Sequence, residues 1–195
     1  MLEFLRNKIL PLILFLGELI ILIVLAYFTV RLIHTFVFQP YYVVGPSMEP
    51  NFYDQDYLLI DKISYHFSTP ERGEIVIVKM PNNQKSLIIK RVIGLPGETV
   101  KVLDGKVYIF NDQYPSSARL SEPYLLEGLE TKGEIERKLG LNEYFVMGDN
   151  RPVSYDGRSF GPIDKSLIVG RTLFRVWPFS HIKFFGDPTY QYIFN

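Results

Sequence analysis

Residues 9–30 form an almost uninterrupted apolar run, which constrains the fold more than any other feature of the chain. The residues that interrupt it are Pro11, Gly17, Glu18, Tyr27 and Thr29. As a helix this run would be about 33 Å long, enough to cross the hydrocarbon core of a bilayer. A cleavable signal peptide would have a shorter apolar core followed by a small-residue cleavage site, and neither is found here. The sequence therefore predicts a retained transmembrane helix, and the absence of a polar face argues against a buried core helix.

Charges on either side of this run predict its orientation. Arg6 and Lys8 precede it, whereas Arg31 and His34 follow it. The positive-inside rule then favours a cytoplasmic N-terminus in the plasma membrane, with the rest of the chain outside the cytoplasm. We expect a cytoplasmic tip and anchor over residues 1–38 and an extracytoplasmic domain over residues 39–195. Glu18 inside the span is either a helix–helix contact or simply a protonated carboxyl group, and we favour the second reading.

The overall composition excludes several classes of function. Lysine plus arginine and aspartate plus glutamate both total 21, so no basic surplus points to nucleic acid. The chain has no cysteine, which excludes disulfides, thiol catalysis and cysteine metal sites. Its histidines, His34, His66 and His181, lack metal-ligand spacing. We therefore expect neither a metal nor an organic cofactor.

After Pro40 the pattern changes to short runs of β-branched and aromatic residues separated by turn residues. The runs cover residues 41–44, 57–63, 74–79, 86–93, 100–103, 106–110, 144–147 and 168–177. They predict a mainly β domain. Asp104-Gly105 joins two of these runs and is a strong signal for a two-residue hairpin, because both residues tolerate positive φ angles. The polar residues 111–142 suggest an insertion over the β core, with a short helix near residues 133–139.

Two chemically suggestive residues follow the apolar run. Ser47 lies in the constrained segment GPSMEP, residues 45–50, and Lys90 opens KRVIGLPG, residues 90–97, at the end of an apolar strand. A serine hydroxyl needs an adjacent base, and a lysine serves only if burial lowers its pKa. Taken alone, such a serine is more often a turn residue, and such a lysine an edge-strand or snorkelling residue. A third segment, GDNRPVSYDGR at residues 148–158, concentrates carboxylates, arginines and a hydroxyl, and alone it would suit a solvated turn.

These three motifs in this order, with RGEIVIV at residues 72–78 between the first two, resemble the sequence boxes of bacterial type I signal peptidases. The resemblance covers most of residues 10–177. It implies a membrane-held serine endopeptidase with a β-rich catalytic domain, in which Ser47 is the nucleophile and Lys90 the general base. Ser154 would orient the lysine amine. The implied ion-pairing residues around the site are Arg91, Asp149, Asp156 and Arg158.

The chain departs from the family pattern at several positions. Asn51 and Phe52 replace the usual Thr-Leu, Glu98 replaces an aspartate, and Gly157 replaces a serine. Gly45 stands where some relatives have a hydroxyl that helps to stabilise the oxyanion, so the second oxyanion donor is open.

The resemblance also implies the substrate, an exported preprotein with small residues at positions −1 and −3 of its cleavage site. It would bind extended against strands, for which residues 41–44, including Val44, and residues 87–89 are candidates. Met48 and Ile89 would narrow the pocket for the residue before the scissile bond, and Phe52 would reshape a side-chain pocket. The partners implied are preproteins and the bilayer, whereas the oligomeric state is open.

The sequence also allows four other interpretations of the protein's function. Ser180 and Lys183 fit a Ser-x-x-Lys motif, although their context near the C-terminus speaks against it. A triad of Ser47 with His66 and either Asp56 or Asp61 would leave Lys90 unexplained. The protein could also be a non-catalytic membrane-tethered module that binds extended segments. Lastly, the peptidase could serve one dedicated surface protein.

Overall fold

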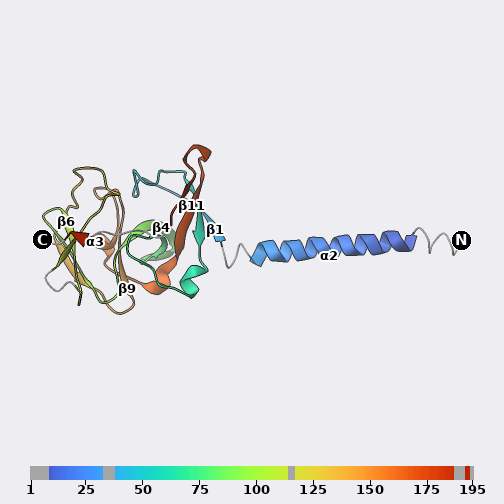
Figure 1. Ribbon diagram of the computed structural model, residues 1–195, viewed down its shortest axis with the longest axis horizontal. Coiled ribbons are helices and arrows are strands. Elements are labelled where there is room, and N and C mark those ends of the chain that lie inside the picture. Colours follow the sequence, from blue (N-terminus) through green and yellow to red (C-terminus); the bar gives the residue numbers. More distant parts are fainter. Residues whose placement is uncertain (1–8, 33–37, 114–116, 187–191, 194–195) are drawn as a thin grey trace. The chain divides into compact units, whose positions relative to one another are not determined.

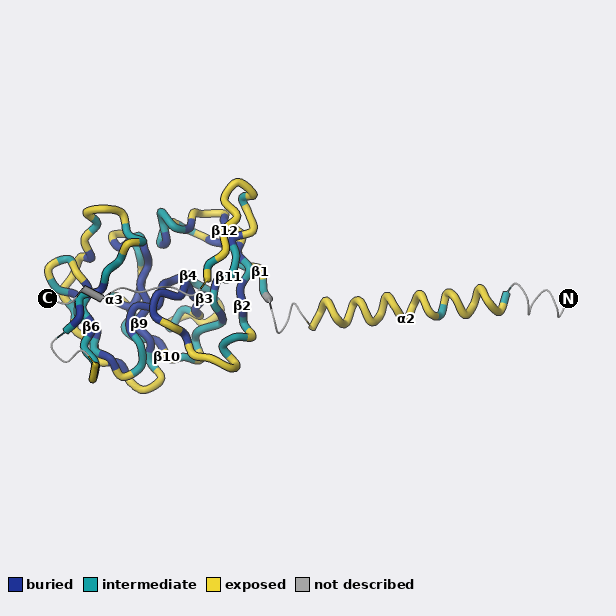
Figure 2. Tube along the Cα trace, in the orientation of Figure 1, coloured by how far each residue is buried: buried dark blue, intermediate teal, exposed yellow. Residues whose placement is uncertain are grey.

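The computed structural model describes residues 9–32, 38–113, 117–186 and 192–193. The chain divides into two compact units, Met1–Phe38 and Gln39–Asn195. In the first unit, helix α2 covers Leu10–Leu32, the long blue helix of Figure 1. It is long and apolar enough to cross a membrane, and none of its residues is buried within the protein (Figure 2). Arg6 and Lys8, on which the predicted orientation depends, lie outside the described residues.

The second unit is built on two antiparallel sheets, so the prediction of a mainly β protein with one N-terminal apolar helix is confirmed. In the described part of the chain the larger sheet has eight strands in the order β1-β2-β11-β3-β4-β9-β10, with β12 pairing β11. Its strands are β1 (Phe38–Tyr42), β2 (Tyr57–Asp61), β3 (Ile75–Met80), β4 (Asn83–Gly94), β9 (Glu143–Met147), β10 (Ile163–Asp164), β11 (Ile168–Trp177) and β12 (Lys183–Phe184).

The smaller sheet has the order β13-β7-β6-β5-β8. Its strands are β5 (Thr99–Leu103), β6 (Lys106–Phe110), β7 (Ala118–Leu120), β8 (Ile135–Lys138) and β13 (Tyr192–Ile193). The remaining elements are short: α3 (Gly157–Phe160), η3 (Ser64–His66), η4 (Lys165–Leu167) and η5 (Phe179–His181).

Strand β3 shows why the larger sheet is apolar on both faces. Ile75 and Ile77 point into one core cluster, whereas Val76 and Val78 point into another. Because successive side chains of a strand alternate between faces, a strand covered on both sides has a continuous apolar sequence. A third cluster joins the two sheets, with Ile93 from β4 packed among residues of β5 and β6. The long strand β4 thus contributes to every part of the core (Figure 2).

The predicted hairpin is present. Leu103 pairs with Lys106 across the turn, and Asp104 and Gly105 have φ angles of 49° and 74°. Two other predictions differ from the structure at strand ends. The strand expected over residues 41–44 ends at Tyr42, because Val43 turns to exchange backbone hydrogen bonds with residues 55 and 56. The strand expected to reach residue 63 ends at Asp61, whose carboxylate accepts hydrogen bonds from the backbone and hydroxyl of Ser64.

The predicted helix near residues 133–139 is wrong. These residues instead contain β8, which pairs antiparallel with β5. Ile135 is partly buried and residues 136–138 are exposed, and Lys101 forms an ion pair with Glu136 across the strands at 3.0 Å. The edge of β5 offers a whole row of backbone hydrogen bonds, and this tertiary pairing overrides the weak local helix preference.

Candidate active site

Ser47 lies in the loop between β1 and β2. The loop is closed at its base, where Val43 donates its N–H to Asp56 and Gln55 donates to Val43. Within it, the N–H groups of Asn51 and Phe52 both donate to the Met48 carbonyl, which forms a helical turn directly after the serine. Met48 and Phe52 are completely buried beneath this turn and hold it against the sheet. The serine is therefore presented by an irregular segment on a rigid support.

Lys90 lies on β4 and is 2 % exposed. Its Nζ atom donates hydrogen bonds to the Ser47 Oγ atom at 2.8 Å and to the Ile89 carbonyl at 2.8 Å. The structure thus brings the two residues singled out by the sequence within hydrogen-bonding distance, although 43 positions separate them.

Burial is the main influence on the Lys90 amine. It lowers the pKa of Lys90 from 10.5 to about 8, against the opposing Coulombic effect of Asp156 and Asp149. Burial disfavours a charged amine because the protein interior solvates the charge less well than water. A substantial fraction of Lys90 is consequently neutral in mildly alkaline solution and can accept a proton.

The loop after β9 also holds the backbone around Ser47 in place. Asn150 donates its N–H to the Ser47 carbonyl at 3.1 Å and its side-chain amide to the Pro46 carbonyl at 3.1 Å. A Cβ atom on Gly148 would lie 2.4 Å from the Ser47 carbonyl oxygen and 2.1 Å from the Ser154 Oγ atom. Only glycine therefore fits at this position. Asn150 was not among the predicted site residues, and its place in the third motif is the sequence signal that points to it.

Arg91 and Asp149 form a buried ion pair behind the dyad. Arg91 donates from Nε and Nη2 to the two carboxylate oxygens at 2.8 and 2.6 Å, which is the bidentate geometry typical of strong pairs. Asn51 adds a further hydrogen bond to Asp149 at 2.8 Å, and the Tyr124 ring stacks on the guanidinium at 3.9 Å. Asn51, which departs from the family pattern, therefore connects the serine loop to the loop after β9.

Asp156 and Arg158 form a second bidentate pair, with both N–O distances at 2.9 Å. Asp156 also accepts the Gly148 N–H at 3.0 Å. Burial raises the pKa of this carboxyl, but the hydrogen bonds and charge of Arg158 and the N–H of Gly148 outweigh it, so the net pKa is lowered. Asp156 thus remains a carboxylate that fixes the turn at Gly148.

Ser154 lies beside Gly148, but its hydroxyl has no hydrogen-bond partner in the described part of the protein. The contacts of the Lys90 amine are with Ser47 and the Ile89 carbonyl. The carbonyl preceding the lysine therefore makes the contact that the resemblance led us to expect from Ser154.

Two further departures from the family pattern have a structural explanation. Both carboxylate oxygens of Glu98 accept from the Arg72 Nη2 atom, at 2.6 and 2.8 Å, and one of them also accepts the N–H of Leu95 at 2.8 Å, so Glu98 holds the turn after β4. At Gly157 a Cβ atom would lie 2.8 Å from the Val146 carbonyl, which leaves no room for a serine side chain.

The residues suggested for substrate binding lie around the dyad in different environments. Met48, Phe52 and Ile89 belong to one buried core cluster, and Phe52 stacks on Phe185. Val44, by contrast, is 74 % exposed. Strand β4 pairs with β3 as far as Arg91, whereas β9 covers its other edge only from Arg91 onward. In the described residues, the edge of β4 leading to the dyad thus has no neighbouring strand.

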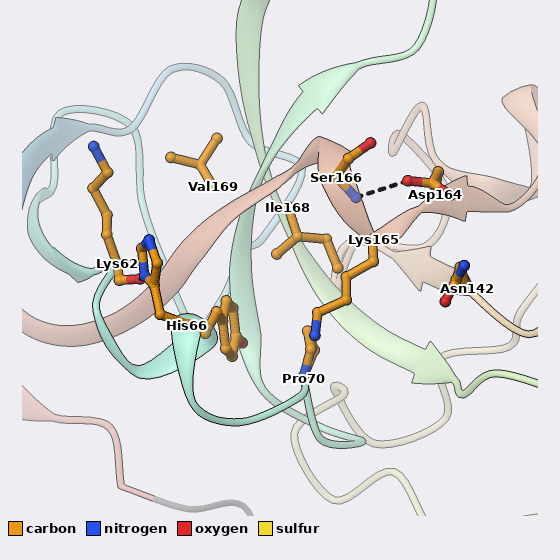
Figure 3. A pocket seen from close by; sticks show the side chains of 10 residues that line it. Lys62, His66, Pro70, Asn142, Asp164, Lys165, Ser166, Ile168 and Val169 are labelled. Carbon is orange, nitrogen blue, oxygen red and sulfur yellow. Dashed lines mark hydrogen bonds between the residues drawn. The ribbon is translucent and has the colours of Figure 1, made fainter. Parts of the chain in front are cut away.

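The histidine alternative does not match the geometry. His66 lines a cavity of about 440 Å³ together with Lys62 and Lys165, and neither Ser47 nor Lys90 lines it (Figure 3). The two aspartates considered for that triad, Asp56 and Asp61, form ion pairs with Arg175 and Arg171.

The Ser-x-x-Lys alternative also fails. Ser180 lies in the three-residue helix η5, but Lys183 already belongs to strand β12, so no helical turn places the lysine beside the serine. Among the residues that the structure describes, no group of three or more histidine, aspartate or glutamate side chains is arranged to hold a metal ion.

Comparison with known proteins shows which family the chain is similar to. Residues 16–177 match the family model described as "Signal peptidase, peptidase S26". A signal peptidase I of Bacillus licheniformis is 37% identical over 172 residues, covering 83% of this chain and 88% of the relative. A signal peptidase I of Leptolyngbya laminosa is 37% identical over 163 residues, covering 80% of this chain and 77% of the relative. The crystal structure of a signal peptidase I from Enterococcus faecalis V583 is 30% identical, with a TM-score of 0.45 over 53% of this chain and 97% of that one. The family match over most of the chain, together with these identities, shows that the protein belongs to the signal peptidase family, peptidase S26.

Proposed function

We propose that this protein is a membrane-anchored serine endopeptidase that removes signal peptides from exported preproteins, with Ser47 as nucleophile and Lys90 as general base. The contact between Lys90 Nζ and Ser47 Oγ at 2.8 Å, made by an almost fully buried lysine, is the observation that carries the proposal. Family membership supplies the reaction class.

In acylation, the neutral Lys90 amine accepts the Ser47 hydroxyl proton while Oγ attacks the carbonyl carbon of the scissile bond. The resulting ammonium then donates that proton to the departing amine of the mature protein, which breaks the C–N bond. The Ile89 carbonyl holds the amine in place during both transfers, because it accepts a hydrogen bond from Nζ.

In deacylation, the neutral Lys90 amine takes a proton from water while the water oxygen attacks the ester carbon. The ammonium then returns that proton to Ser47 Oγ as the ester C–O bond breaks, and the released signal-peptide acid loses its proton to solvent as a carboxylate. The oxyanion of each tetrahedral intermediate needs preorganised donors. We assign one to the Ser47 N–H, which donates to no other group in the described residues. Gly45 has no hydroxyl, so a second donor comes from another backbone group or from water.

The substrate would bind as an extended strand along the open edge of β4, which leads directly to Lys90. This arrangement carries the scissile carbonyl toward Ser47. Exposed Val44 would contact the substrate from the other side, while Met48 and Ile89 beneath the site restrict the space before the scissile bond to small side chains. Phe52 would influence the shape of this pocket indirectly, because it packs in the same buried cluster as Met48.

The anchor α2 would hold the enzyme in the plasma membrane with its N-terminus in the cytoplasm and the catalytic residues outside. A signal peptide enters the same membrane through its own apolar segment. Tethering both molecules to one surface raises their effective concentration, so weak contacts at the site suffice.

The decisive experiment is cleavage of a preprotein with an Ala-x-Ala site by detergent-solubilised wild type, Ser47→Ala and Lys90→Ala. Sequencing of the new N-terminus should place the cut after the second alanine, and both variants should be inactive. If folded wild type binds such preproteins unchanged, it is a binding module. Cleavage of a single surface protein alone would indicate a dedicated peptidase, and activity surviving in Lys90→Ala would refute the dyad.

A further inference from the structure

Glu18 is the one charged residue in the apolar part of helix α2. Side chains three or four positions away share its helix face, and all of these are apolar: Leu14, Phe15, Ile21 and Leu22. The helix itself therefore provides no partner for the carboxyl group. Ionisable groups at such depth are costly, and they typically pair with a group from another segment.

The distance from Glu18 to the end of helix α2 is close to the length of the apolar region of a signal peptide. It precedes the helix end at Leu32 by 14 residues, which corresponds to about 21 Å. A signal peptide has an apolar region of about 7–15 residues, which spans at most about 22 Å as a helix. If the far end of this region lies level with Leu32, a region near the upper end of this range places the positively charged segment before it at a depth close to that of Glu18.

In place of the isolated protonated carboxyl group favoured from the sequence, we propose that Glu18 is a substrate-recognition residue whose ionised carboxylate pairs, within the membrane, with a lysine or arginine that precedes the apolar region of the signal peptide. The inference rests on the proposed function and on the cytoplasmic position of the N-terminus. Opposite charge favours this occupant over a second copy of α2, which would place two carboxyl groups against each other.

The first test compares two preproteins that differ only by lysine or glutamine before the apolar region, with the enzyme in phosphatidylcholine vesicles. This zwitterionic lipid removes the competing attraction of anionic headgroups. Wild type should cleave the lysine preprotein with a kcat/KM about fivefold higher, mainly through KM. Glu18→Gln should abolish this preference. Thr29→Val, which alters another polar residue of the same helix, should retain it.

The second test measures how the preferred length of the apolar region depends on the position of the carboxylate along the helix. Moving the carboxylate from position 18 to position 25, as Glu18→Leu with Leu25→Glu, shifts it by seven residues, about 10 Å, on nearly the same face. Leu25 is 61 % exposed, and no residue of α2 is buried within the protein. In a series of lysine preproteins with graded apolar lengths, the preferred length should become shorter by about seven residues.

The outcomes separate this inference from the proposed function. Cleavage by wild type without a charge preference, an equal preference in Glu18→Gln, or an unchanged preferred length in the relocated variant would each overturn the role of Glu18 alone. If wild type cleaves neither preprotein, the proposed function fails and the inference fails with it.

Discussion

Replacing Lys90 with methionine should abolish cleavage and yet leave the protein at least as stable at neutral pH. The folded-state pKa of about 8 lies some 2.5 units below the unfolded value of 10.5. Between these two values the unfolded state binds more protons than the folded state, so this group makes stability rise with pH. The size of the effect is about 3 kcal/mol, since each unit corresponds to about 1.4 kcal/mol.

The effect of Lys90→Met on the free energy of unfolding therefore changes sign with pH. At pH 7 wild type carries the full cost of the buried ammonium, whereas the variant loses only two hydrogen bonds of about 1 kcal/mol each. The variant should then be more stable by about 1 kcal/mol at pH 7 and less stable by about 2 kcal/mol at pH 11. Shifts of other groups, such as the raised pKa of Tyr41, cancel in the difference between the two proteins.

Urea unfolding of both proteins in the same detergent, followed by fluorescence of the single tryptophan, Trp177 on β11, would measure this difference. The activity of wild type should rise with pH and reach half of its maximum near pH 8, because the neutral amine is the base. Lys90→Arg is the matched control and should be inactive at every pH, because its guanidinium stays protonated. A stability difference that does not change between pH 7 and pH 11 would refute the depressed pKa, and an activity limb near pH 6.5 would instead indicate a histidine base.

Three further substitutions test the support around the dyad. Ser154→Ala should leave kcat and cleavage-site specificity unchanged on a panel of preproteins, because the Ile89 carbonyl holds the Lys90 amine and the Ser154 hydroxyl makes no hydrogen bond in the described residues; a lowered kcat would restore an orienting role to Ser154. Gly148→Ala should lower kcat/KM by more than about tenfold, because its Cβ atom must displace the Ser47 backbone; wild-type kinetics would show that the loop relaxes freely. Asp149→Asn should destabilise the fold by about 3–5 kcal/mol in urea titrations, since it leaves the Arg91 charge buried without its anion, and a loss under about 1 kcal/mol would contradict that account.

The elements that were well predicted are those whose signals are local. The apolar run of α2 and the Asp104-Gly105 turn depend on length, hydropathy and the φ preferences of single residues. The helix expected near residues 133–139 failed because pairing with the edge of β5 decided its structure. Asn150, which donates a hydrogen bond to the Ser47 backbone, was not predicted, because nothing in the sequence indicates which group an asparagine will contact.

By itself, the sequence determined the class of the protein: a membrane-length helix, a β-rich domain, and a serine and a lysine set in ordered motifs. These follow from composition, periodicity and residue order, which are properties of the chain alone. Only the tertiary structure decided that the lysine is buried, that its pKa falls to about 8, and that the Ile89 carbonyl contacts its amine. Burial and electrostatics depend on which distant segments surround a group. Ser47 and Lys90 are 43 positions apart in the chain, and only the pairing and packing of the sheet bring their side chains together.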